Sequence, residues 1–185
     1  RVDVDSIRSY IDEPAVSKET ARQAYDDSVR YLSDIYKKMY TKLQDSFDYI
    51  VTLSDHGEML GEDGAWDHLY GVYPELTHIP LVVDGSDLGG NSNSIVNLCD
   101  VYSTILDIAS ISTDPDRFSL FDEPTTSHLL TEYHGLPPSL RESLLSDGHN
   151  VDCFEEELHG IVFEDGDYGY ETGSGFRSTN GSVER

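Results

Sequence analysis

Apolar residues recur at steps of three and four positions between Lys18 and Gln44, and polar residues fill the positions between them. This spacing places the apolar side chains on one face of a helix, so it predicts a single long amphipathic helix. Ser17 stands directly before the pattern and is a suitable N-cap residue. The apolar positions are Ala21, Ala24, Tyr25, Val29, Leu32, Ile35, Tyr36, Met39, Tyr40 and Leu43.

Two short apolar runs, Tyr49–Leu53 and Ile79–Val83, predict strands. The first is mostly apolar, which is typical of a buried strand in a parallel sheet, and we expect it to be one. Pro80 has no backbone N–H to give to a ladder and should therefore lie at the start of the second strand. Helical spacing returns over Val96–Ala109. The order helix, strand, loop, strand, helix predicts an α/β layer.

The pattern changes after residue 112. His128–Tyr133 reads as a strand, and Gly160–Glu164 and Tyr168–Tyr170 flank the turn sequence Asp165-Gly166-Asp167, which indicates a hairpin. The Gly/Ser-rich stretch Thr172–Arg185 is expected to be a frayed tail. We therefore expect three parts: an α/β region over residues 1–112, a smaller antiparallel element over 113–171, and a flexible tail over 172–185.

Charge excludes one class of partner. The 185 residues include 36 acidic and only 12 basic ones, which gives a formal net charge of -24. A nucleic-acid partner would require a basic surface, so we expect none. Disorder is a poor explanation of the charge, because 37% of the residues are hydrophobic and they fall in periodic runs. Dispersed carboxylates with few lysines are typical of a protein from a halophile, and no apolar run is long enough to span a membrane.

Candidate chemistry follows the first strand. Asp55 and His56 come directly after Tyr49–Leu53, and ligands in open α/β sheets bind beyond the carboxyl ends of strands. A carboxylate beside an imidazole at such a position suits a divalent cation. For a lone Asp-His pair, a solvated turn is the better explanation of the residues, so the surrounding sequence has to decide.

The surrounding residues resemble the second metal-binding signature of the sulfatases, a family of the alkaline-phosphatase superfamily. The run Thr52-Leu-Ser-Asp-His-Gly-Glu-Met-Leu-Gly-Glu-Asp-Gly-Ala-Trp-Asp-His68 is similar to the family pattern T-S-D-H-G-x-x-L-G-E-H-G-x-W-x-K. An apolar strand with Pro80 follows, as in the family, and the resemblance covers about residues 20–112. It implies the C-terminal part of an alkaline-phosphatase-like α/β sandwich with a smaller antiparallel C-terminal element.

Carried over by this resemblance, Asp55 and His56 are metal ligands. The ion is usually calcium in sulfatases, while manganese, magnesium and zinc stay open for this oxygen-rich set with an imidazole. His68 stands where most sulfatases have a lysine that contacts the sulfate, so it would bind sulfate or protonate the leaving oxygen. Phosphoethanolamine transferases of the same superfamily have D-H-G-E-x-L-G-E-x-G-x-x-x-H, and this spacing fits the chain as well.

The sulfatase nucleophile motif, C-x-P-x-R or S-x-P-x-R, does not occur in the sequence. We therefore expect a partial sulfatase that is inactive alone and whose intact form hydrolyses small-molecule or glycan sulfate esters through a divalent metal and a formylglycine. Two alternatives remain open. One is a phosphodiesterase, phosphonate hydrolase or phosphoethanolamine-type transferase on the same scaffold, and the other is an inactive fragment. The sequence does not indicate an oligomeric state.

Overall fold

The computed structural model describes residues 17–85, 93–111, 118–122, 126–148 and 150–180. They divide into two compact units. The first comprises residues 1–90 and 135–155, and the second comprises 91–134 and 156–185. Among the described helices, none combines the length and the apolar composition that crossing a bilayer requires.

The first unit opens with α2 (Lys18–Leu43), which confirms the long helix expected from the spacing. The Ser17 side chain accepts a hydrogen bond from the Thr20 N–H at 3.2 Å and caps the helix as expected. Three side chains tie α2 to the rest of the unit. Tyr36 bonds Thr52 at 2.6 Å, Arg22 Nε donates to the Leu60 carbonyl at 2.7 Å, and Tyr40 donates to Asp84.

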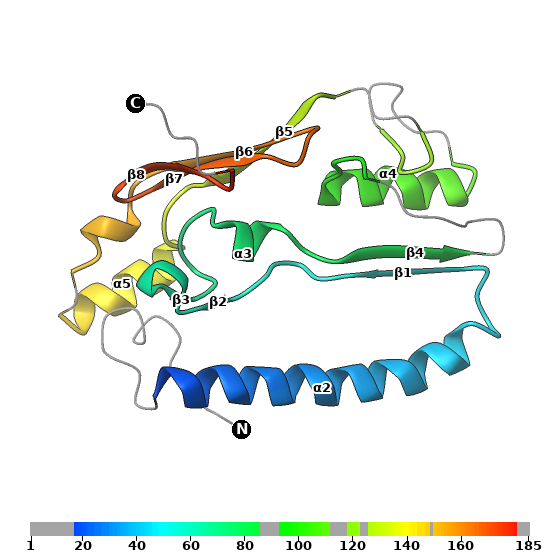
Figure 1. The fold of residues 1–185 in the computed structure, drawn as a ribbon, viewed down its shortest axis with the longest axis horizontal. Helices are drawn as coiled ribbons and strands as arrows, with labels where there is room; N and C mark the ends of the chain where they lie inside the picture. Colours follow the sequence, from blue (N-terminus) through cyan, green and yellow to red (C-terminus); the bar gives the residue numbers. More distant parts are fainter. Residues whose placement is uncertain (1–16, 86–92, 112–117, 123–125, 149, 181–185) are drawn as a thin grey trace. The chain divides into compact units, whose positions relative to one another are not determined.

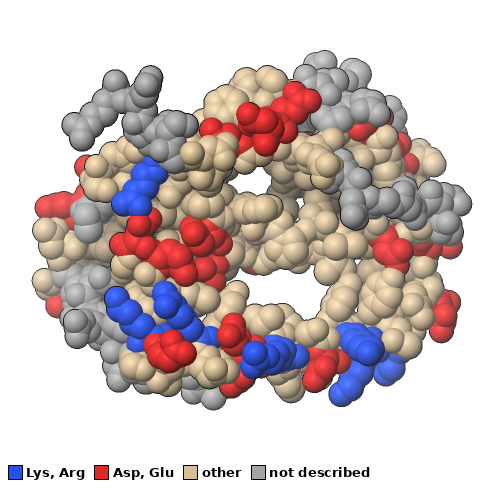
Figure 2. Space-filling model, in the orientation of Figure 1, with Lys and Arg blue, Asp and Glu red and all other residues tan. Residues whose placement is uncertain are grey.

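None of the residues of α2 is fully buried, although the helix carries a stripe of apolar side chains. Six of the twelve basic residues of the chain also lie on it. Figure 2 shows these side chains in blue along the helix, interspersed with acidic ones in red. They are Lys18, Arg22, Arg30, Lys37, Lys38 and Lys42. The basic residues are therefore concentrated on one element, while the acidic residues are dispersed.

Strand β1 (Tyr49–Leu53) pairs with β4 (Leu81–Gly85), and the pairing is antiparallel, with Val51 opposite Val83. The prediction of a buried strand in a parallel sheet is therefore wrong for this chain. The connection between the two strands contains no long crossover helix, which parallel pairing requires, and folds back on itself instead. Strand β1 is half-buried, because it has a neighbour on only one side among the described strands.

The connection from β1 to β4 holds the candidate site. It contains β2 (Met59–Leu60), a short 3₁₀ turn (Glu62–Gly64), β3 (Trp66–Asp67) and the one-turn helix α3 (Pro74–Thr77). Figure 1 shows α2 running alongside β1 and β4, with the β2–β3 hairpin near the start of the helix. Pro80 directly precedes β4, which agrees with its expected place at the start of the strand.

The core of the first unit lies under this connection. Met59 and Val72 are almost fully buried, and so are Leu144 and Val151 from the later segment of the unit. That segment contains α5 (Pro138–Ser146) and a 3₁₀ turn (Asp152–Phe154). Its Phe154 ring meets the Tyr70 ring edge-on at a centroid distance of 5.2 Å. Packed apolar side chains therefore anchor the backbone that carries the candidate site.

The second unit contains α4 (Leu98–Ile108) and a four-stranded sheet. The sheet order is β5 (His128–Tyr133), β6 (Leu158–Phe163), β7 (Tyr168–Thr172) and β8 (Gly175–Ser178), and all pairs are antiparallel. The predicted helix, the strand and the hairpin are thus confirmed. Strand β8 corrects the expectation of a frayed tail over its four residues, because its backbone pairs with β7.

Candidate metal and substrate site

The segment after β1 is fixed by backbone contacts. The Gly57 N–H donates to the Leu76 carbonyl at 2.9 Å, and the Ser54 hydroxyl donates to the His56 carbonyl at 2.6 Å. A Cβ atom at position 57 would overlap the carbonyl oxygen of Glu75, so only glycine allows this approach. The close passage at Gly57 sets the positions of His56 and Glu58 on either side of it.

The β2–β3 hairpin brings Glu58 and His68 together. Met59 lies opposite Asp67 in the hairpin register, so the residues one step further out, Glu58 and His68, face each other at its open end. Glu58 Oε2 lies 3.0 Å from His68 Nδ1. Met59 is completely buried and Asp67 almost so, which anchors both neighbours of this pair.

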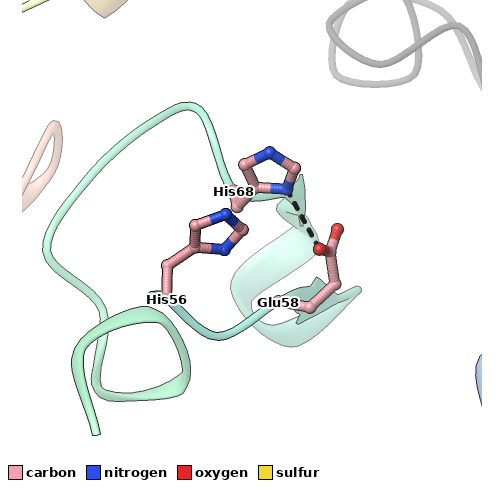
Figure 3. Close-up of side chains that lie close together, drawn as sticks. All are labelled: His56, Glu58 and His68. Carbon is pink, nitrogen blue, oxygen red and sulfur yellow. Dashed lines mark hydrogen bonds and ion pairs between the residues drawn. The ribbon is translucent and has the colours of Figure 1, made fainter. Parts of the chain in front are cut away.

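His56 completes the cluster. Its ring stacks on the His68 ring at a centroid distance of 4.2 Å with an interplanar angle of 21°. One ligand atom from each of His56, Glu58 and His68 lies within 4.8 Å of the others, and these residues form the one such group among the described His, Cys, Asp and Glu side chains. Figure 3 shows the three side chains close together, with His56 and Glu58 before β2 and His68 directly after β3.

Asp67 also contacts His68. Its Oδ1 accepts the His68 backbone N–H at 2.6 Å and lies 3.1 Å from His68 Nδ1. The backbone of Asp67 is in the left-handed region at φ 75°, a conformation that an aspartate accepts more easily than most residues. His68 Nδ1 therefore faces two carboxylate oxygens, from Glu58 and Asp67, which orient the ring.

Asp55 is arranged differently from the cluster. Its Oδ1 accepts the His56 backbone N–H at 3.1 Å, and its Oδ2 lies 3.6 Å from His56 Nε2, while the side chain is 86% exposed. His56 Nδ1 lies 2.8 Å from the Gly57 carbonyl, and only a protonated Nδ1 can bond to a carbonyl. In this tautomer His56 Nε2 carries a lone pair next to the Asp55 carboxylate. A nitrogen lone pair and a carboxylate oxygen side by side can both bind a divalent cation.

Sequence reasoning named Asp55, His56 and His68, and the fold brings all three into one loop region. Within the described part of the chain, the ion pairs of Asp55 are with His56 alone, whereas His68 contacts Glu58 and Asp67. Glu58 was missed as a candidate ligand. It lies in the D-H-G-E run, but its ten-residue separation from His68 closes only when the hairpin forms. A turn signal within Gly61–Gly64 is the one feature of the sequence that points to that closure.

The match to a family model covers the same region. The sulfatase family model matches residues 6–111, which is more than half of the chain. Arylsulfatase K of Mus musculus is 36% identical over 69 residues, and these are 36% of this chain and 12% of that protein. Arylsulfatase K of Canis lupus familiaris is 28% identical over 102 residues, 54% of this chain and 19% of that protein.

Arylsulfatase K of Xenopus laevis is 35% identical over 65 residues, 34% of this chain. The chain thus matches between 12% and 19% of the length of these relatives. Sulfatases act on sulfate esters and generally use a divalent metal, and the donor residues around His56 are of the kind that binds one. On the match to residues 6–111, the chain belongs to the sulfatase family.

Proposed function

We propose that this chain supplies one half of a sulfatase active site, and that the intact enzyme hydrolyses sulfate esters. The observation that carries the proposal is the pair formed by Asp55 and His56 at the end of β1, with His56 Nε2 facing the Asp55 carboxylate at 3.6 Å. In this proposal residues 1–112 belong to the C-terminal half of an alkaline-phosphatase-like catalytic domain. Residues 113–171 belong to a smaller subdomain, and strand β8 extends its sheet beyond residue 171.

Asp55 and His56 would hold the divalent ion, with calcium favoured by the family resemblance and manganese, magnesium or zinc as alternatives. The bound ion would supply positive charge to the oxygens of the sulfate group. The backbone of this chain prepares the two ligands: the Gly57 carbonyl fixes the tautomer of His56, and the His56 N–H holds Asp55.

His68 is proposed to contact the sulfate or to protonate the leaving oxygen. Glu58 and Asp67 occupy its Nδ1, so Nε2 is the atom that can reach a substrate. An imidazolium in this position donates from Nε2 to a sulfate or ester oxygen. The nucleophile motif is absent from the sequence, so the proposal assigns the nucleophile to a segment outside these 185 residues.

A second candidate is phosphoryl chemistry on the same scaffold, as in phosphodiesterases, phosphonate hydrolases or phosphoethanolamine-type transferases. The observation that favours it is His68 itself, which occupies the position of the sulfatase lysine and stacks on His56. A third candidate, an inactive fragment, follows from the missing nucleophile motif.

The test is an assay with a chromogenic aryl sulfate and the matching aryl phosphate, on the chain alone and on a protein that joins it to a nucleophile segment. The chain alone should turn over neither ester. In the joined protein, Asp55→Ala and His56→Ala should lower both metal content and sulfate turnover, and His78→Ala, at an exposed histidine outside the cluster, should change neither. Turnover of the phosphate ester only would replace the proposal by the second candidate.

Two substitutions of His68 test its role in the same assay. His68→Ala should lower kcat about a hundredfold, the scale of losing one charge-stabilising donor, and calcium content should remain. His68→Lys should keep activity, because an ammonium can donate to the same sulfate oxygens. Loss of calcium in His68→Ala, together with an inactive His68→Lys, would assign His68 to the metal instead.

A further inference from the structure

We propose that His56, Glu58 and His68 form a second, overlapping metal site that selects an imidazole-preferring ion such as Zn²⁺. This site stands on its own geometry and goes beyond the proposed sulfatase function. It shares His56 Nε2 with the Asp55–His56 pair and uses Nδ1 of His68. Zn²⁺ bound there would therefore compete with the catalytic ion and inhibit the intact enzyme.

The geometry is close to what an ion requires. Two ligands at about 2.1 Å from a tetrahedral ion lie about 3.4 Å apart. Glu58 Oε2 and His68 Nδ1 are already 3.0 Å apart, so a shift of a few tenths of an ångström admits the ion between them. The ion takes the place of the Nδ1 proton of His68, which is released to solvent.

The third ligand atom is His56 Nε2. His56 Nδ1 is committed to the Gly57 carbonyl, and an imidazole whose second nitrogen is held by a carbonyl oxygen is typical of metal-bound histidine. The stacked rings place the two imidazoles on the same side of the loop (Figure 3). One ligand atom from each of the three residues lies within 4.8 Å of the others, against about 3.4 Å for two ligands of a tetrahedral ion, so binding requires these side chains to close by about 1 Å.

The donor set decides the kind of ion. Two imidazoles and one carboxylate suit zinc and similar transition metals, whereas calcium prefers six to eight oxygen ligands. Asp67, with Oδ1 3.1 Å from His68 Nδ1, adds a negative charge that favours a dication. The side chains are also preorganised, because the buried residues Met59 and Asp67 hold the backbone next to Glu58 and His68.

The second unit provides a matched control. His159 Nδ1 lies 2.9 Å from Glu171 Oε2, which reproduces the contact between His68 and Glu58 on an exposed sheet. His159 and Glu171 do not belong to a group of three ligand atoms among the described residues. A His159→Asn variant therefore removes a histidine with a carboxylate partner without touching the proposed site.

The experiment is calorimetric titration of the 185-residue chain with ZnCl₂ and, separately, with CaCl₂. We expect one Zn²⁺ per chain, bound at least tenfold more tightly than Ca²⁺. Glu58→Gln and His68→Asn should each raise the Kd for Zn²⁺ at least tenfold, and His159→Asn should leave it within about twofold. Asp55→Asn should leave the Zn²⁺ affinity within about threefold, because Asp55 is not in the donor set.

Cobalt provides a second measurement in case a variant folds poorly. Co²⁺ bound by two imidazoles and a carboxylate in a tetrahedral site should give a visible absorption band, which Glu58→Gln should abolish and the shorter Glu58→Asp should weaken. Circular dichroism of each variant shows whether it is folded.

Unchanged Zn²⁺ affinity in both Glu58→Gln and His68→Asn would overturn the proposal. If Asp55→Asn weakened Zn²⁺ binding as much as Glu58→Gln does, Asp55 would be a ligand of the same ion, and the proposal of a separate site would be wrong. A Ca²⁺ affinity that does not depend on Asp55 would count against the proposed function alone, so the two failures are distinguishable.

Discussion

At the scale of single residues, the candidate site depends on one glycine. The backbone at Gly57 passes so close to the Glu75 carbonyl that no side chain fits, and its N–H bonds the Leu76 carbonyl. Because His56 and Glu58 flank it, this contact positions one member of each proposed ligand set. A residue with no chemistry of its own therefore controls the geometry of those that have it.

Replacing Gly57 by Ala should lower the free energy of unfolding by about 1 to 3 kcal/mol, the usual cost of forcing extra volume into a packed site. The added Cβ must push the Glu75 carbonyl away, which breaks the bond from Gly57 to Leu76. Urea denaturation measures the change. Gly64→Asn is the control, because a Cβ at position 64 meets nothing and asparagine tolerates its φ of 82°. An equal loss in both variants would show that the overlap at Gly57 is not the cause.

At the scale of elements, α4 has the most complete local signals. Asn97 accepts from the Cys99 N–H at 2.7 Å and from the Asp100 N–H at 3.3 Å, and Asp100 accepts the Asn97 N–H at 2.8 Å. These reciprocal bonds form a capping box, so local chemistry fixes where the helix begins.

Asn97→Ala should therefore destabilise the second unit by about 1 kcal/mol, and Asn97→Asp should cost much less, since aspartate caps equally well. Thermal unfolding followed by circular dichroism measures both. Equal Tm values for Asn97→Ala and the wild type would show that the cap does not stabilise the unit.

The sheet of the second unit has a pH-dependent pair. Glu171 accepts from His159 across β6 and β7, and this hydrogen bond raises the pKa of His159 above 6.5 and lowers the pKa of Glu171 below 4.5. The His159 contribution is full below pH 6.5 and is lost as pH rises through its raised pKa. The Glu171 contribution is full above pH 4.5 and is lost as pH falls through its lowered pKa.

The pair should thus stabilise the sheet most between about pH 4.5 and 6.5. Measuring Tm from pH 3.5 to 8.5 should show this maximum reduced in Glu171→Gln and retained in Glu164→Gln, at an exposed acid of the same unit. Both side chains are about half exposed, so molar salt should also weaken the effect. Parallel profiles for the wild type and Glu171→Gln would contradict the assignment.

At the scale of the whole molecule, charge is the dominant property. A net charge of -24 in 185 residues means that dispersed carboxylates repel one another throughout the chain. The charged side chains on α2 are of mixed sign (Figure 2), and the basic ones outnumber the acidic ones there, so the whole acidic excess lies in the rest of the chain. We infer a protein adapted to high salt, in which ions screen this repulsion.

Lowering the salt from molar KCl to about 0.1 M lengthens the Debye length from about 3 to 10 Å and restores the repulsion. Tm should then fall by at least about 3 °C, the shift that about 1 kcal/mol produces in a chain of this size, and should recover when KCl is returned. Differential scanning calorimetry in both buffers measures it. Equal stability at the two salt levels would argue against a halophilic origin.

Local interactions explain which parts of this protein were predictable from the sequence. The long helix with its Ser17 cap, the helix over α4, the strand β5 and the β6–β7 hairpin all follow from periodicity, capping residues and turn residues that lie close together in the chain. The motif around Asp55, His56 and His68 identified the family for the same reason, since it is a continuous run of sequence.

Long-range contacts decided the rest. The antiparallel pairing of β1 with β4 was mispredicted because the apolar pattern of a strand does not indicate the direction of its partner. The loop between the two strands folds back and does not cross over the sheet. Strand β8 forms because β7 offers it a free edge. Glu58 became a candidate ligand only when the hairpin register placed it opposite His68 and the Gly57 contact stacked His56 on the same ring. The sequence alone determined the residue types that could bind a metal, while the tertiary structure decided which of their side chains meet, because ligands distant in sequence come together only through packing.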